Sequence, residues 1–176
     1  MADNQTISAT VTRGIQLQLI PPLKRPCSVP AIEPKGVVYT KRWVVELLLD
    51  LSGYCSDKNL VDTLAIEPAT GDGAFLGPMI ERLIESCGNL GRSLAECDHS
   101  LIAYELDEKS AARARAVAQN ILTNRGVKRP LAKRLSEAWV LNRDYLLEPD
   151  STQADFIIGN PPYIRLEEIP EETATV

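Results

Sequence analysis

The chain has 176 residues, of which 44% are hydrophobic and 24% charged, and its formal net charge is −5. This length and apolar content are typical of one globular domain with a core of its own. No apolar run approaches the ~18 residues that a membrane span needs. The acidic balance argues against a stand-alone DNA-binding domain, which usually has a basic face.

The first predicted element follows a proline-punctuated stretch. Residues 1–35 are polar and then proline-rich (IPPLKRPCSVPAIEP), which indicates an extended arm, so we expect the packed domain to cover residues 36–176. Residues 41–53 (KRWVVELLLDLSG) predict a helix that ends at a glycine. Residues 62–68 (DTLAIEP) predict a short buried strand, because an apolar run is broken by proline.

Alternating helices and strands follow. Residues 73–88 predict a helix that carries one apolar stripe and ends at Gly88, and residues 101–106 (LIAYEL) predict a strand. Residues 107–126 predict a helix with Asp107 as N-cap and Gly126 as its end. Strands are expected at residues 138–144 (AWVLNRD) and 155–159 (DFIIG). This order predicts an α/β fold, with a parallel sheet that is covered on both faces.

Charge and cysteines give weaker signals. Residues 109–136 contain no acid and eight basic residues, which we interpret as a solvated helix face and loop. Five of them lie between a predicted helix and the next strand, so they are expected at the amino ends of the strands, away from a ligand site: Arg125, Lys128, Arg129, Lys133 and Arg134. The four cysteines lack CxxC spacing and are expected to be reduced thiols of a cytoplasmic protein. Cys97 and His99 do not complete a metal site, because no second close pair of ligands occurs. The amino terminus has no secretory signal pattern.

Polar or glycine-rich peptides follow all four predicted strands, and ligands of an open parallel sheet bind at this carboxyl edge. Glu67-Pro-Ala-Thr-Gly71-Asp-Gly73 is a tight glycine turn, although it is neither a dinucleotide fingerprint nor a Walker loop. Glu105 can accept both hydroxyls of a ribose, and Asp144 with Tyr145 can hold an adenine by its amine and its face. Each signal is modest alone, but together they predict a pocket for an adenosine-bearing cofactor.

The fourth peptide is Gly-Asn-Pro-Pro-Tyr, residues 159–163. With EPATGDGAF and the earlier GVVYT, it resembles the amino-adenine DNA methyltransferases, particularly those of restriction–modification systems, over roughly residues 36–166. The resemblance implies a Rossmann-like fold and S-adenosylmethionine as cofactor. It implies cofactor contacts from Tyr39, Thr40, Glu67, Ala69, Gly71, Gly73, Glu105, Asp144 and Tyr145. It implies a catalytic corner made of Asn160, Pro161, Pro162 and Tyr163.

The chemistry of such a corner is methyl transfer to an exocyclic amine, whose lone pair is shared with the ring. Acceptors on the amine hydrogens, here the side-chain oxygen of Asn160 and the carbonyl of Pro161, would localise that lone pair. The prolines stiffen the corner, and Tyr163 offers a flat face for a base flipped out of double-stranded DNA. Two departures from the family pattern, Lys41 in place of Pro and Thr70 in place of a frequent Cys, remove no required group.

The resemblance leaves three interpretations open. The first is the cofactor-binding half of an adenine-specific DNA methyltransferase, truncated after its fourth strand. The second is a methyltransferase of protein glutamine or of an RNA base, and the third is a non-catalytic module that binds the cofactor or a partner. The family's spatial strand order, third, second, first, fourth, would leave residues 155–159 at an edge, where we expect pairing with a missing C-terminal half or with a second copy.

Overall fold

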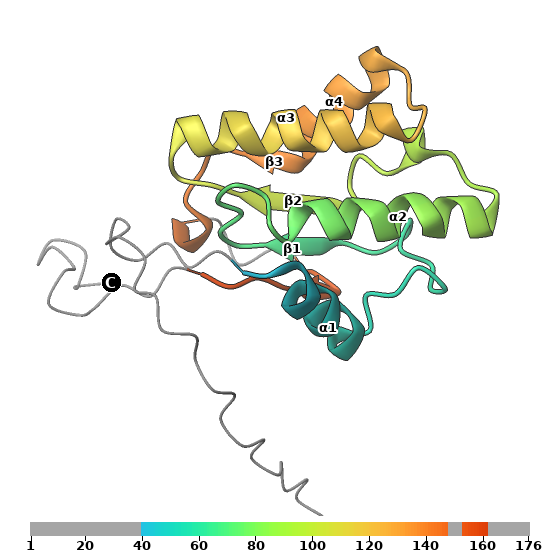
Figure 1. Ribbon diagram of the computed structural model, residues 1–176, viewed down its shortest axis with the longest axis horizontal. Helices are drawn as coiled ribbons and strands as arrows, with labels where there is room; N and C mark the ends of the chain where they lie inside the picture. Colours follow the sequence, from blue (N-terminus) through green and yellow to red (C-terminus); the bar gives the residue numbers. More distant parts are fainter. Residues whose placement is uncertain (1–39, 148–152, 162–176) are drawn as a thin grey trace, which may run out of the picture. The chain divides into compact units, whose positions relative to one another are not determined.

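The computed structural model describes residues 40–147 and 153–161 (Figure 1). Every described residue belongs to one compact unit of the chain, which lies within Glu33–Val176. The predicted arm, residues 1–35, lies outside the described residues. So do three of the predicted site residues, Tyr39, Pro162 and Tyr163.

The centre of the fold is a parallel sheet of four strands. These are β1 (Ala65–Glu67), β2 (Leu101–Tyr104), β3 (Val140–Leu141) and β4 (Phe156–Ile157), in the order β3-β2-β1-β4. All three pairings are parallel, and Ala65 of β1 lies opposite Leu101 and Phe156. The predicted α/β class and strand order are confirmed, and the order is Rossmann-like. Because β4 joins the far side of β1, the strand order reverses between these two strands, which is where such sheets bind ligands.

Four helices pack against this sheet: α1 (Arg42–Ser52), α2 (Leu76–Leu90), α3 (Glu108–Asn124) and α4 (Arg129–Trp139). Figure 1 shows α2 and α3 side by side along the sheet. Buried residues of all four helices form one cluster with Ala65, Leu101 and Val140, which point to the same face. Ile66 and Tyr104 point to the other face and are buried outside that cluster. The expected helical cover is therefore confirmed for one face.

Helix α1 has one buried face and one exposed face that carries large apolar side chains. It ends where predicted, at Gly53, whose φ of 79° is left-handed and so favours glycine. Val45 and Leu49 are buried, whereas Trp43 and Leu51 are 65% and 75% exposed. Among the described residues, no helix is both long and apolar enough to cross a membrane.

Helix α2 ends one turn later than predicted. Gly88 lies inside the helix, and Gly91 is the residue that adopts the left-handed conformation, with a φ of 64°. The N–H of Gly91 bonds to the last carbonyls of the helix, those of Cys87 and Gly88. Gly88 was the wrong choice because the helical conformation tolerates glycine, and a second glycine three residues later provides the C-cap.

Helix α4 was missed, and the predicted strand 138–144 starts too early. Residues 138 and 139 are helical, and β3 begins at Val140. Pro130 stands in the first turn, where its missing N–H costs nothing. The buried side of α4 repeats at helical spacing with Ala132, Leu135 and Trp139. The basic residues of the same segment hid this apolar stripe in the sequence.

Two further segments are 3₁₀ turns, η1 (Leu94–Glu96) before β2 and η2 (Tyr145–Leu147) after β3. The basic residues near α4 lie at the amino edge of the sheet, as predicted. Arg134 pairs with Asp98 at 3.0 Å and donates to the carbonyl of Ala95, both of which precede β2.

Candidate cofactor site

A cavity of about 620 Å³ opens at the carboxyl ends of the strands. This size is within the range of pockets that bind small molecules. Its lining comes from the loops after all four strands, from Thr40 just before α1 and from the first turns of α3. The lining residues that were predicted from the sequence are Thr40, Glu67, Ala69, Gly71, Glu105, Asp144, Tyr145, Asn160 and Pro161.

The loop after β1 is the tight glycine turn that the sequence predicts. Gly71 and Gly73 have φ values of 52° and 84°, a conformation that other residues rarely adopt. The N–H of Thr70 bonds to the carbonyl of Tyr104 at 2.9 Å, which holds the turn to the end of β2. Gly73 is not among the cavity-lining residues, because a Cβ there would point toward Val117 of α3, at 3.7 Å. Gly71 therefore faces the cavity, and Gly73 faces the packing between the turn and α3.

Glu67 is a carboxyl buried at the floor of this turn, with an exposed fraction of 1%. Burial raises its pKa to about 8, against the opposing effect of hydrogen bonds from the Thr70 hydroxyl and the Phe75 N–H. The Thr70 bond is 2.7 Å long. Near neutral pH the group is therefore mainly protonated and can donate as well as accept hydrogen bonds.

Glu105 joins the end of β2 to the glycine turn. One carboxylate oxygen accepts from the N–H of Gly71 at 2.7 Å, and the other accepts from the N–H of Asp107 at 2.8 Å. Each oxygen has a second lone pair, so the group can still accept hydroxyl donors from a ligand. Asp107 is the N-cap of α3, as predicted, and accepts from the N–H of Ser110 at 2.7 Å.

The segment after β3 brings an acid and an aromatic ring to the same rim. Asp144 accepts from the N–H of Leu146 at 3.0 Å, which orients its carboxylate within η2. The ring of Tyr145 packs against that of Tyr104, with 5.4 Å between centroids and a tilt of 55°. Both predicted residues are thus held in place by contacts within the described part of the chain.

The corner after β4 lies directly beside the glycine turn. The N–H of Ile158 bonds to the carbonyl of Ile66 at 2.8 Å, which extends the β1–β4 pairing to the edge of the cavity. At Gly159 a Cβ would lie 3.1 Å from Cδ of Pro68, so only a glycine fits easily between the two loops. Asn160 follows, and its side-chain nitrogen donates to the hydroxyl of Thr40 at 3.2 Å.

Several contributors were not predicted from the sequence. Leu106 and Leu146 line the cavity beside predicted residues, and they are 73% and 85% exposed. Asn142 donates to the carbonyls of Glu105 and Leu106 at 2.8 and 2.9 Å, and so fixes the loop after β2. In the sequence, the position of Leu106 directly after Glu105 could have indicated that it lines the cavity. The role of Asn142 depends on the pairing of β2 with β3.

The charge of the lining is mainly negative. Four acids, Asp72, Glu105, Asp107 and Asp144, line the cavity beside the mainly protonated Glu67, and its basic residues are Arg113 and Arg143. Arg113 pairs with Asp72 at 2.8 Å, which further reduces its attraction for an anion. Such a lining suits a cationic, hydroxyl-rich ligand better than a di- or triphosphate. Among the described residues, no group of three or more histidine, cysteine, aspartate or glutamate side chains is placed to hold a metal ion.

The chain is similar in sequence to several known methyltransferases. No protein-family model matches the chain. The chain is 39% identical over 142 residues to the Type II methyltransferase M.XhoI of Xanthomonas vasicola and 39% over 145 residues to M.BstVI of Geobacillus stearothermophilus. It is 34% identical over 142 residues to M.PaeR7I of Pseudomonas aeruginosa. These matches cover 78–79% of this chain but only 25–26% of each relative, so the chain spans about a quarter of their length.

Proposed function

We propose that this chain is the cofactor-binding part of a Type II restriction–modification enzyme that methylates the N6 amine of adenine in double-stranded DNA. The observation that carries the proposal is the cavity, where the ends of four strands converge beside Asn160 and Pro161. The similarity to three Type II methyltransferases supports it. In such a role the protein would act on cellular DNA in the cytoplasm.

The residues of the cavity fit S-adenosylmethionine, which supplies an activated methyl group on a sulfonium. Its net positive charge suits the acidic lining, and its adenosine suits the groups at the rim. Glu105 would accept the ribose hydroxyls while it keeps its bond to Gly71. Asp144 would accept from the adenine amine, and Tyr145 with Leu106 would contact the faces of the adenine.

The floor of the cavity would determine how close the cofactor comes to the backbone. At Gly71 a Cβ would meet no other atom within 4 Å, so the left-handed φ of 52°, not crowding, is what favours glycine here. Glu67 with a proton could donate to a carboxylate or accept from an ammonium at the amino-acid end of the cofactor. Thr40, at the same end of the cavity as Asn160, would contribute a hydroxyl.

The reacting amine would be held by Asn160 and the carbonyl of Pro161. Because Nδ2 of Asn160 donates to Thr40, its Oδ1 is the atom available to accept from the amine. A second acceptor on the other amine hydrogen would favour tetrahedral nitrogen and localise the lone pair for in-line attack. Pro162 and Tyr163, which lie outside the described residues, would stiffen the corner and stack on the flipped base.

The remaining three quarters of a relative's length would supply DNA recognition. Strand β4 is at one edge of the described sheet, and no described strand pairs with its outer side. We expect the rest of a longer enzyme, or a second copy of this chain, to pair there. Size-exclusion chromatography with light scattering over a concentration series tests whether two copies of this chain associate.

The deciding experiment has two steps. Calorimetry of the chain with S-adenosylmethionine, ATP and NAD should show binding of the first alone, and equal binding of ATP would contradict the proposed cofactor. Transfer of labelled methyl groups is then measured on duplex DNA, RNA and a glutamine-containing peptide, with and without the C-terminal part of a relative such as M.XhoI. The expected result is label in N6-methyladenine of DNA alone. Label in the peptide or the RNA would show that this molecule, and not DNA, is the substrate.

A further inference from the structure

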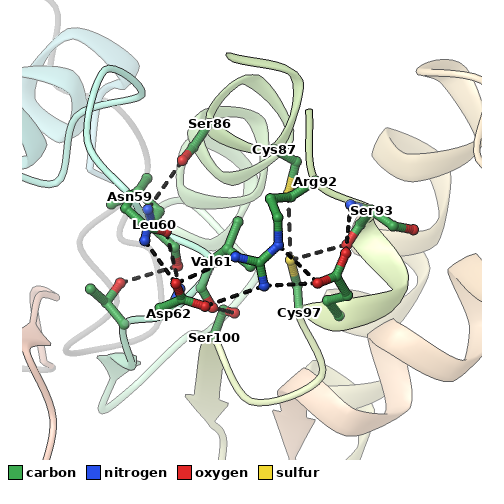
Figure 2. Close-up of polar contacts among 12 residues, drawn as sticks. Asn59, Leu60, Val61, Asp62, Ser86, Cys87, Arg92, Ser93, Cys97 and Ser100 are labelled. Atoms are coloured by element: carbon green, nitrogen blue, oxygen red, sulfur yellow. Dashed lines mark hydrogen bonds and ion pairs between the residues drawn. The ribbon is translucent and has the colours of Figure 1, made fainter. Parts of the chain in front are cut away.

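Cys87 and Cys97 lie side by side, although ten residues separate them in the sequence (Figure 2). Their sulfur atoms are 3.4 Å apart, and both side chains are buried. Cys87 is in the last turn of α2, and Cys97 directly follows η1. An S–S bond is about 2.05 Å long, so the two atoms need to approach by little more than an ångström.

Backbone contacts hold both cysteines in this position. The carbonyl of Cys87 accepts from the N–H of Arg92 at 2.9 Å, as part of the C-cap of α2. The carbonyl of Cys97 accepts from the indole N–H of Trp139 at 2.8 Å and from the N–H of Ser100 at 3.1 Å. The proximity of the sulfurs is therefore set by helix α2, the start of β2 and the buried Trp139.

The connecting segment is exposed, although the sulfurs are not. Residues 88–93 are exposed, and Arg92 forms ion pairs with Glu96 at 2.7 Å and with Asp62 at 3.3 Å. Figure 2 shows the Arg92 side chain alongside the two cysteines. A small oxidant therefore has to pass only a surface segment, not the core of the sheet.

The two thiols are not equivalent. The pKa of Cys97 is lowered because its sulfur accepts a hydrogen bond from the Cys87 thiol, whereas that bond and burial raise the pKa of Cys87. The positive charge of Arg92 lowers the pKa of both. Of the two thiols, Cys97 is thus the one that loses its proton more readily.

We propose that Cys87 and Cys97 form an oxidisable dithiol that closes to an intramolecular disulfide when a hydroperoxide reacts with it. The Cys97 thiolate attacks one peroxide oxygen, so that a sulfenic acid forms on Cys97 and hydroxide leaves. The Cys87 sulfur then attacks the Cys97 sulfur, and the sulfenic hydroxyl leaves with the Cys87 proton as water. The hydroxide of the first step takes up the proton that Cys97 released when it became a thiolate. In sum, two thiols and one hydrogen peroxide become one disulfide and two waters.

The bond would act on stability and not on the cofactor cavity. It would join the end of α2 to the segment before β2, at the amino edge of the sheet, whereas the cavity lies at the carboxyl edge. Closing a loop of about ten residues restricts the unfolded chain, so the Tm of the oxidised protein should rise by roughly 5–10 °C.

The test uses the full chain with Cys27→Ser and Cys55→Ser, which leaves only the pair. After treatment with one equivalent of hydrogen peroxide, the intact mass should fall by two hydrogen atoms and recover with dithiothreitol. Trypsin cleaves after Arg92, between the two cysteines, so the disulfide should appear as a link between the peptides of residues 83–92 and 93–109. The matched control Cys87→Ala should show neither the link nor the rise in Tm.

Three results would overturn the proposal. One is a folded protein whose Cys87 and Cys97 stay reduced in excess peroxide. Another is oxygen addition to either sulfur without a link between the two peptides. In the unsubstituted chain, preferential crosslinking through Cys27 or Cys55 would count equally against it. Calorimetry with S-adenosylmethionine before and after oxidation should give the same affinity, and a loss of binding would contradict the separation of the two edges.

Discussion

The side-chain amide of Asn160 donates a hydrogen bond to the hydroxyl of Thr40, with 3.2 Å between Nδ2 and Oγ1. The two residues are 120 positions apart and meet at the rim of the cavity. An amide group presents nitrogen on one side and oxygen on the other, so this bond decides which atom of Asn160 faces a ligand. Thr40 is thereby a positioning residue for the proposed catalytic corner.

Thr40→Val should free the Asn160 amide to rotate, whereas Thr40→Ser should keep it in place. In a preparation that methylates DNA, the valine variant should lose about tenfold in kcat, which corresponds to ~1.4 kcal/mol for one hydrogen bond. The KM for DNA should change little. In the chain itself, the NMR signals of the Asn160 side-chain amide should move in the valine variant and not in the serine variant. Unchanged signals and turnover in Thr40→Val would remove this role.

Glu105→Ala should weaken S-adenosylmethionine binding by about 1–3 kcal/mol, or roughly 5- to 150-fold. The change removes the proposed ribose acceptor and also leaves the Gly71 N–H without its carboxylate partner. Glu108→Ala is the matched control, because Glu108 is exposed in the first turn of α3 and does not line the cavity. Calorimetry of both variants is the measurement, and equal affinities would argue that the cofactor binds elsewhere.

Glu67 should make the protein less stable at alkaline pH. Its pKa is about 8 in the folded state and near its ordinary value of 4.5 when unfolded. Between these values the folded state holds a proton that the unfolded state has released, so the free energy of unfolding falls as the pH rises from about 5 to about 8. Glu67→Gln has no such proton, and its loss of stability between pH 6 and 8.5 should be smaller. The free energy of unfolding of both proteins is measured by urea unfolding at both pH values. Equal losses of stability in the two proteins would contradict the raised pKa.

Gly159→Ala and Gly88→Ala should change stability in opposite directions. At Gly159 the new methyl group would lie 3.1 Å from the Pro68 ring, so the corner or the glycine turn must shift, at a cost of about 1 kcal/mol or more. At Gly88, inside α2 and exposed, a Cβ meets nothing within 4 Å, and alanine should stabilise the helix by roughly 0.5–1 kcal/mol. The Tm of both variants, measured by thermal unfolding, tests this prediction. A Gly159→Ala variant as stable as the parent would show that the two loops can separate.

Elements with a strong local signal were predictable from the sequence. Helix α1 ends at Gly53 and α3 begins at the N-cap Asp107, because glycine and aspartate satisfy helix ends through their own backbone or side chain. Each strand was found within its predicted segment, since a buried parallel strand is an uninterrupted apolar run. Helix α4 was missed because basic residues surround its apolar stripe, and Gly88 was taken for the end of α2 because a glycine inside a helix looks the same in sequence as a C-cap.

By itself, the sequence determined which peptides follow the strands, and hence the residues of the candidate site, because a parallel sheet collects the carboxyl ends of its strands at one edge. Only the tertiary structure decided which atoms meet there. The bond from the Gly71 N–H to Glu105 and the orientation of Asn160 by Thr40 join residues that are far apart in the chain, and the contact between Cys87 and Cys97 joins a helix to the segment before the next strand. Such contacts depend on strand register and helix packing, which bring these residues together although no local pattern in the sequence records them.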